Sequence, residues 1–207
     1  VANEDVGLAG IVDIAGNQVL KTIEVGDEPE GVGISPDGKF VYVTSEDDSI
    51  VSVIDTETDV LVKTFKVGLR PRTAVFSPDS SRAYVSSERS GTVSVVDTSM
   101  HEVIQTVQLT GKTVRPMGIA VAPDGSTIYV TTGRGRNVVA INTATNEVVG
   151  SVEVGVRPWG IAITPDGKTL YTANGPDNDV SVVNAETLQV VTKIKVGERP
   201  WGVVTVP

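Results

Sequence analysis

The sequence contains no cysteine, a single histidine and few aromatic residues. The absence of cysteine excludes disulfides, thiolate zinc sites, cysteine nucleophiles and iron–sulfur clusters. No apolar run approaches the roughly 20 residues that a membrane span requires, so the sequence predicts a soluble protein without membrane insertion. Basic residues are outnumbered, 17 Lys and Arg against 26 Asp and Glu, for a net charge of −9. Nucleic acid is therefore not an expected partner, because binding phosphates needs a basic surface.

A short turn motif recurs along the chain as SPDG, SPDS, APDG and TPDG, at intervals of 42, 45 and 42 residues. Its prolines are Pro36, Pro78, Pro123 and Pro165. The tyrosines share this spacing: Tyr42, Tyr84, Tyr129 and Tyr171. A fixed period of about 42 residues indicates a repeat architecture.

Each period contains four short segments rich in Val, Ile, Thr and Tyr and bounded by turn residues, which is typical of β-strands. The clearest repeat predicts strands over 31–35, 40–45, 50–55 and 60–67. Four-stranded antiparallel units repeated at this period predict an all-β fold, the β-propeller, in which each unit is one blade.

The two ends of the chain are predicted to complement each other. Residues 1–5 align with part of a second strand, and residues 201–203 align with a first strand. Five repeats with an insertion near Lys112 then account for the length, and the C-terminal strand is expected to complete the terminal blade. This closure removes open sheet edges. Residues 1–207 are expected to form a single domain and a monomer.

The segment PEGVGISPDGKFVYVTSEDDSIVSVIDTETDVLVKTFKVG resembles the YVTN family of β-propeller repeats, in which Tyr42-Val43-Thr44-Ser45 occupies the place of the name-giving tetrapeptide. NGPDNDVSVVNAETLQVVTKIKVGERPWGVV is similar to propellers associated with pyrroloquinoline-quinone-dependent alcohol catabolism. This resemblance implies a periplasmic or extracellular location and provides no catalytic residues. The family normally has seven repeats, so the alternative is a five-blade remnant of a seven-bladed propeller.

The residues that precede five equivalent loop prolines are the first candidate site residues. They are Glu28, Arg70, Arg115, Arg157 and Arg199. Four guanidinium groups at one repeat position of an acidic protein predict a site for a small anionic ligand, because the guanidinium fork matches carboxylate and phosphate. The alternative is that each arginine forms an ion pair with a neighbouring blade.

One residue beyond each of these prolines, the side chain varies strongly in chemistry. These positions hold Glu30, Arg72, Met117, Trp159 and Trp201. We expect this position to face the channel mouth, with the two indoles as an aromatic wall opposite Arg72 and Glu30. The alternative is that the indoles only fill the channel.

Catalytic and metal sites are not expected. A single histidine, His101 in a predicted turn, does not allow a Ser, His and Asp constellation, and the acidic residues near Glu46 lack the spacing of a calcium loop. The sequence therefore predicts a protein that is not an enzyme, has no cofactor and binds a small anion or a protein partner, as an accessory to quinoprotein oxidation. The alternatives are a cell-surface structural or adhesion module and a propeller subunit of an oxidoreductase.

Overall fold

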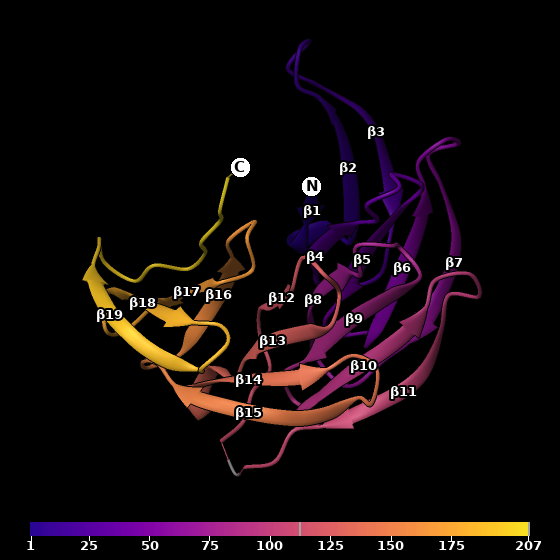
Figure 1. The fold of residues 1–207 in the computed structure, drawn as a ribbon. Coiled ribbons are helices and arrows are strands. Elements are labelled where there is room, and N and C mark those ends of the chain that lie inside the picture. Colours follow the sequence, from indigo (N-terminus) through magenta and orange to yellow (C-terminus); the bar gives the residue numbers. More distant parts are fainter. Residues whose placement is uncertain (112, 207) are drawn as a thin grey trace. The chain divides into compact units, whose positions relative to one another are not determined.

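The strands occupy the positions that the repeat predicts. The computed structural model describes residues 1–111 and 113–206, so Lys112, where the sequence places an insertion, lies outside the described residues. Within these ranges the secondary structure consists of β-strands and two short 3-10 helices, η1 (Glu4–Val6) and η2 (Gly133–Gly135) (Figure 1). Neither of these helices is long and apolar enough to cross a membrane.

In the described residues, nineteen strands form one three-stranded and four four-stranded sheets, with strands consecutive in sequence lying next to each other. The first sheet contains β1 (Ala2–Asn3), β2 (Leu8–Asp13) and β3 (Gln18–Glu24). The second contains β4 (Pro29–Ile34), β5 (Phe40–Ser45), β6 (Ile50–Asp55) and β7 (Val60–Lys66), and the third β8 (Pro71–Phe76), β9 (Arg82–Ser87), β10 (Thr92–Asp97) and β11 (Glu102–Gln108). The fourth contains β12 (Ile119–Val121), β13 (Thr127–Thr131), β14 (Asn137–Asn142) and β15 (Glu147–Glu153), and the fifth β16 (Pro158–Ile163), β17 (Thr169–Asn174), β18 (Asp179–Asn184) and β19 (Gln189–Lys195). The all-β fold with blade-like sheets is therefore confirmed.

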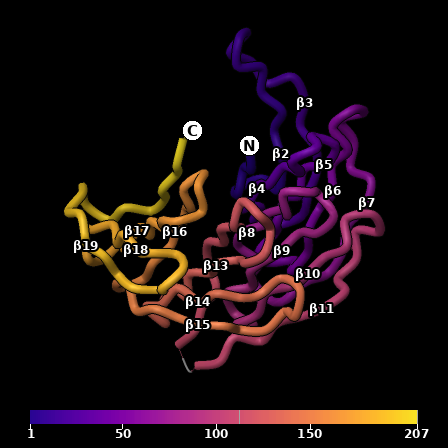
Figure 2. The backbone as a smooth tube through the Cα atoms, in the orientation of Figure 1, coloured from indigo at the N-terminus to yellow at the C-terminus, as the bar shows by residue number. Residues whose placement is uncertain are grey.

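The chain divides into two compact units, which the backbone trace of Figure 2 follows from indigo to yellow. The first unit holds Val1–Ser90 and Ser94–Thr106, and the second holds Gly91–Val93 and the chain from Val107 onward. Each unit has its own buried core. The single domain over 1–207 stays a prediction, because it concerns how the units join.

Pairing of the chain ends also stays a prediction. The first sheet has three strands, and residues 201–206 form no strand in the described part of the chain. Within the second unit this C-terminal segment lies against β16. The Gly160 amide donates to the Trp201 carbonyl at 3.0 Å, and the Thr205 hydroxyl donates to the Ile163 carbonyl at 2.7 Å.

The repeated turn between the first two strands has a local hydrogen-bond network. The Ser35 hydroxyl donates to Asp37 Oδ1 at 2.7 Å, and the Lys39 amide donates to the same oxygen at 3.2 Å. These two hydrogen bonds lower the pKa of Asp37 to about 2, and the one from the Ser35 hydroxyl has the larger effect. Gly38 between them has a φ of 74°, which glycine adopts without strain. The Pro-Asp-Gly motif therefore specifies this turn through both its side chain and its glycine.

Tyr42, one of the aligned tyrosines, packs between two sheets of the first unit. Tyr42 of β5 is fully buried, and its ring centroid lies 4.6 Å from that of Phe76 in β8 of the next sheet. Its hydroxyl shares a hydrogen bond with His101 Nδ1 at 2.7 Å. His101 lies in a turn, as predicted, and packs edge-on against Phe40, with ring centroids 4.6 Å apart.

Glycines in β4 and immediately before β12 allow neighbouring sheets to approach closely. A Cβ atom at Gly33 of β4 would lie 2.2 Å from the Ala74 carbonyl oxygen of β8. In the second unit, the Gly118 amide donates to the Trp159 carbonyl at 3.1 Å, and a Cβ at Gly118 would lie 2.6 Å from the same oxygen. The inner strands of adjacent sheets are therefore in direct backbone contact.

We predict that Gly33→Ala lowers the free energy of unfolding by about 1–3 kcal/mol, because β4 and β8 must separate to admit the methyl group. Gly197→Ala is the matched control, since no atom lies within 4 Å of a Cβ built there. Urea denaturation of both variants measures the effect. Equal stability of the two variants would show that the close approach of β4 to β8 is not a constraint.

Candidate functional site

The residues before the loop prolines share an unusual backbone conformation. Glu28, Arg70, Arg157 and Arg199 have φ angles of 50°, 59°, 51° and 49°. Few residues other than glycine adopt positive φ, and such strain is often retained at functional sites. The sequence does not reveal this feature, because the residue before proline normally prefers an extended backbone.

In the first unit, Arg72 of β8 is surrounded by carboxylates. Its Nη1 contacts both Glu30 and Glu46, while its Nε and Nη2 donate to Glu88 Oε2 at 2.8 and 2.6 Å. Arg70 contacts Glu46 and lies 3.5 Å from Glu88 Oε2. We call Glu30, Glu46, Arg70, Arg72 and Glu88 the Arg72 cluster. Arg70 thus follows the ion-pair alternative, and Arg72 is ion-paired as well.

Glu28 belongs to an acidic surface of the first unit that borders the Arg72 cluster. It lines a cavity with other carboxylates from η1 and the loops before β4 and after β5, including Glu4, Asp27 and Asp47. The negative charge of Asp47 is the main cause that raises the pKa of Glu28. This surface concentrates carboxylates, so it does not support the anion site that the sequence predicts around Glu28.

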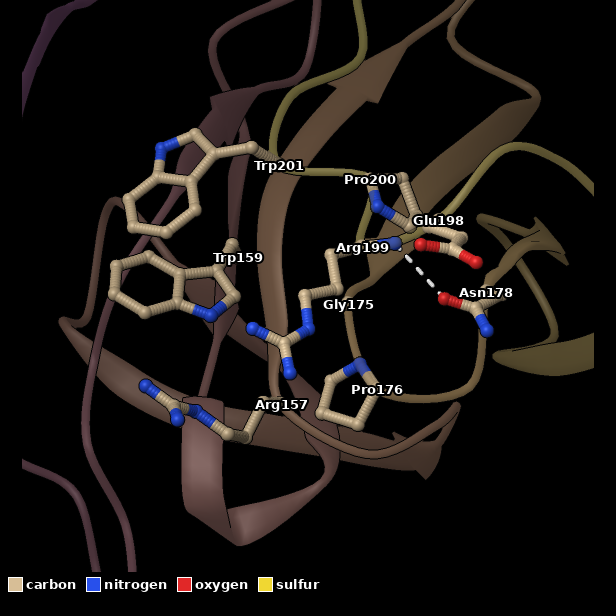
Figure 3. A pocket seen from close by; sticks show the side chains of 9 residues that line it. All are labelled: Arg157, Trp159, Gly175, Pro176, Asn178, Glu198, Arg199, Pro200 and Trp201. Atoms are coloured by element: carbon tan, nitrogen blue, oxygen red, sulfur yellow. Dashed lines mark hydrogen bonds between the residues drawn. The ribbon is translucent and has the colours of Figure 1, made fainter.

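In the second unit, the predicted aromatic residues meet. Trp159 of β16 and Trp201 are stacked, with ring centroids 3.8 Å apart and an interplanar angle of 26°. The Arg157 guanidinium carbon lies 5.3 Å from the Trp159 ring centroid, on the face opposite Trp201 (Figure 3). Trp159 is half-buried, whereas Trp201 is 60% exposed. Trp159 is therefore held between an indole and a guanidinium, a favourable cation–π arrangement.

These residues line a pocket of about 510 Å³, which we call the Trp–Arg pocket. Its lining residues are Arg157, Trp159, Gly175, Pro176, Asn178, Glu198, Arg199, Pro200 and Trp201. The volume is in the range of small-molecule sites. Pro176 and Asn178 were not predicted individually, although the sequence places their loop on the same face as the arginines.

Arg199 and Arg157 direct their guanidinium groups to the same side of the Trp–Arg pocket, whereas the Glu198 carboxylate points away from both (Figure 3). The Arg199 backbone amide donates to Asn178 Oδ1 at 2.8 Å, which fixes the start of the loop. Neither arginine forms an ion pair with any residue in 1–111 or 113–206. Their charges are therefore available to a ligand.

Arg115 belongs neither to the Arg72 cluster nor to the lining of the Trp–Arg pocket. It is half-buried, and its Nη1 donates to the Val114 carbonyl at 3.2 Å. Unlike the other three arginines of its repeat position, it does not have a positive φ. The predicted set of nine site residues is thus divided between the Arg72 cluster, the acidic surface around Glu28, the Trp–Arg pocket and the isolated Arg115.

A single repeat position separates paired from unpaired arginines. Four residues after the repeat tyrosine, the loop begins with Glu46 and Glu88 in the second and third sheets. The same position holds Gly133 and Gly175 in the fourth and fifth sheets. Both glutamates pair with arginines, and the glycines provide no carboxylate. The difference between glutamate and glycine at this position is visible in the sequence. Its meaning becomes clear only when the structure shows which arginines form ion pairs.

A family model described as "Lactonase, 7-bladed beta-propeller" matches residues 32–198, most of the chain. The chain belongs to this lactonase propeller family. The seven-bladed description agrees with the alternative that the five repeats are part of a seven-bladed propeller. Membership of this family supports the β-propeller fold that the YVTN resemblance implies. The YVTN assignment itself and the link to quinoprotein oxidation stay predictions.

Solved structures similar to this chain support the fold. Hydrazine synthase of Kuenenia stuttgartiensis matches with a TM-score of 0.62 and 20% identity, covering 98% of this chain and 84% of the other. A functionally unknown protein from Desulfotomaculum acetoxidans DSM 771 matches with a TM-score of 0.87 and 18% identity, covering 99% of this chain and 68% of the other. No curated protein matches the sequence significantly.

Membership of the lactonase propeller family corrects one prediction. The inference that the protein is not an enzyme is wrong, because the family description names a lactonase. That inference required a nucleophile activated by histidine. Ester bonds also open when water attacks beside groups that stabilise the developing negative charge. The single histidine therefore does not exclude catalysis.

We predict that Arg72→Met lowers the free energy of unfolding of the first unit by about 3–5 kcal/mol, because it leaves buried carboxylates without their cation. Arg89→Met, at an exposed arginine of the neighbouring loop, should change it by less than about 0.5 kcal/mol. Chemical denaturation measures both values. An Arg72→Met variant as stable as Arg89→Met would contradict a structural role for the cluster.

Proposed function

We propose that the protein binds a small organic anion in the Trp–Arg pocket of the second unit. The observation that carries this proposal is the pair of guanidinium groups, Arg157 and Arg199, directed to one side of a small-molecule-sized pocket without a carboxylate partner in the described residues. Two like charges on one side of a pocket repel each other, and a bound anion removes that repulsion. Guanidinium groups bind carboxylates with two parallel hydrogen bonds.

The stacking order indicates where the rest of the ligand lies. One face of Trp159 is covered by Trp201 and the other by Arg157. A ligand therefore contacts the edge of Trp159, while its charged group meets the two guanidiniums. Pro176 and Pro200 line the same pocket and provide apolar surface. A carboxylate with a compact apolar or hydroxylated body suits this surface better than a highly charged polyanion.

A second candidate function is hydrolysis of a lactone, which the family membership favours. In this reaction water attacks the ring carbonyl carbon, the ring C–O bond breaks, and a hydroxycarboxylate anion and a proton are released. Arg157 and Arg199 would stabilise the negative charge that develops on the carbonyl oxygen. The product is a small organic anion, so both candidates use the same two guanidinium groups.

Gly175 provides the sharpest test of anion binding. Its equivalents Glu46 and Glu88 pair with arginines, and a Cβ atom at Gly175 would meet no atom closer than 3.7 Å. We predict that Gly175→Glu places a carboxylate against Arg157 and Arg199 and reduces anion affinity at least tenfold. Gly175→Gln, of equal size and without charge, should retain binding.

The measurement is titration of tryptophan fluorescence with benzoate and with 4-hydroxybutyrate, at 20 and 200 mM salt. Binding to the unmodified protein should weaken at the higher salt, because the interaction is between charges. Equal affinity of the Glu and Gln variants, or no binding to the unmodified protein, would refute the proposal.

Lactone hydrolysis is tested by proton release from γ-butyrolactone and δ-valerolactone in a pH-stat. We predict acceleration by the unmodified protein and a loss of about 10²–10³-fold in the Arg157→Gln/Arg199→Gln variant. Lys168→Gln/Lys193→Gln removes the same charge from exposed positions and should keep the activity. Proton release at the uncatalysed rate, together with retained carboxylate binding, would eliminate the second candidate and leave the first.

A further inference from the structure

The Arg72 cluster holds more negative than positive charge in a buried place. Its three carboxylates face two guanidinium groups, so one negative charge has no counterpart within the cluster. The side chains of Glu46 and Arg72 are 2% and 9% exposed, so water provides little compensation. Glu88 and Glu30 are 17% and 27% exposed. A surplus charge at such burial is costly unless it is neutralised.

We propose that Glu30 and Glu46 share a proton, which makes the Arg72 cluster a proton-dependent clasp between the second and third sheets. This inference is independent of the proposed function, since it concerns the first unit and none of the residues of the Trp–Arg pocket.

The geometry brings the two carboxyl groups together. Arg72 Nη1 contacts Glu30 Oε2 and Glu46 Oε1, so one nitrogen holds an oxygen of each carboxyl group. Two ionised carboxylates this close repel each other, and a proton between them converts the repulsion into a hydrogen bond. Glu46 has a further contact with Arg70, so it is the carboxyl that stays ionised and accepts. Glu30 is the one that holds the proton.

The acid–base properties of the pair agree with this assignment. Burial, followed by the hydrogen bond with Glu46, raises the pKa of Glu30 to about 8 against the opposing charge of Arg72. For Glu46, burial raises the pKa, but hydrogen bonds from Glu30 and Arg70 and the arginine charges outweigh it and hold the pKa below its ordinary value.

Further charged groups border the cluster. Glu28 precedes β4, Asp47 lies in the loop after β5, and Arg89 lies in the loop after β9, all beside Glu46 and Arg70. Two of these three groups are acidic, so the neighbourhood adds negative potential and favours keeping the proton.

The clasp connects elements that are distant in sequence. Glu30 lies on β4 and Glu46 after β5, both of the second sheet, whereas Arg72 and Glu88 belong to the third. Because the pKa of Glu30 is raised on folding, its stabilising contribution is complete below about pH 4.5 and is lost as the pH rises through about 8. The contact between the two sheets should therefore weaken progressively between about pH 4.5 and pH 8.

Glu30→Gln tests the proposal, because the amide is neutral at every pH and still donates to Glu46. For the unmodified protein, we expect the urea midpoint to fall between pH 5 and pH 8 and to level off above pH 8. In Glu30→Gln the urea midpoint should fall less, so at pH 9 this variant should be more stable than the unmodified protein. Glu57→Gln, at an exposed turn of the same unit, should follow the unmodified protein. All three proteins have the same N-terminus, so titration of the α-amino group is common to them.

Carboxyl carbon NMR of protein labelled at glutamate provides a second readout that does not depend on unfolding. One glutamate should titrate with a midpoint near pH 8, and its signal should be missing in Glu30→Gln. Glu46→Gln should shift that midpoint down by at least one pH unit, because the surplus charge is removed. Titration of all glutamates below pH 6, or identical pH profiles of Glu30→Gln and Glu57→Gln, would overturn the proposal.

Discussion

Direct backbone contact between neighbouring inner strands is the constraint on which the site depends. Gly33 lies against Ala74, and Gly118 lies against Trp159. At these points the strands of adjacent sheets are so close that a residue with a Cβ atom would clash with the facing carbonyl oxygen. At this separation, a side chain on one inner strand reaches the loops of the next sheet. The contact of Glu46 with Arg72 follows from this spacing, and the close approach of Gly160 to the Trp201 carbonyl brings the two indoles together.

The same repeat position serves two electrostatic roles. Where Glu46 and Glu88 begin the loop after the second strand, the arginines form buried ion pairs that join sheets. Where Gly133 and Gly175 begin it, the arginines keep their charge for other partners. A buried ion pair contributes little net stability but is costly to break. One residue per repeat thus decides whether an arginine joins sheets or faces a pocket.

The sequence predicted the strands of the clearest repeat to within two residues, because turn residues such as Pro-Asp-Gly bound each strand. It also predicted that Trp159, Trp201, Arg157 and Arg199 lie on one face. It did not predict which arginines are paired, since that depends on side-chain distances across sheets. The left-handed backbone at Arg70 runs against the usual preference before proline, and only tertiary contacts impose it.

The stacked indoles make the attachment of the C-terminal segment visible to spectroscopy. The chain contains two tryptophans, and both belong to this stack. Transitions of two indoles 3.8 Å apart couple, so their near-ultraviolet circular dichroism differs from that of separate rings. Detachment of residues 201–206 from β16 would abolish the coupling while the sheets keep their far-ultraviolet signal. The molecule therefore contains an intrinsic optical reporter for one local contact rather than for global unfolding.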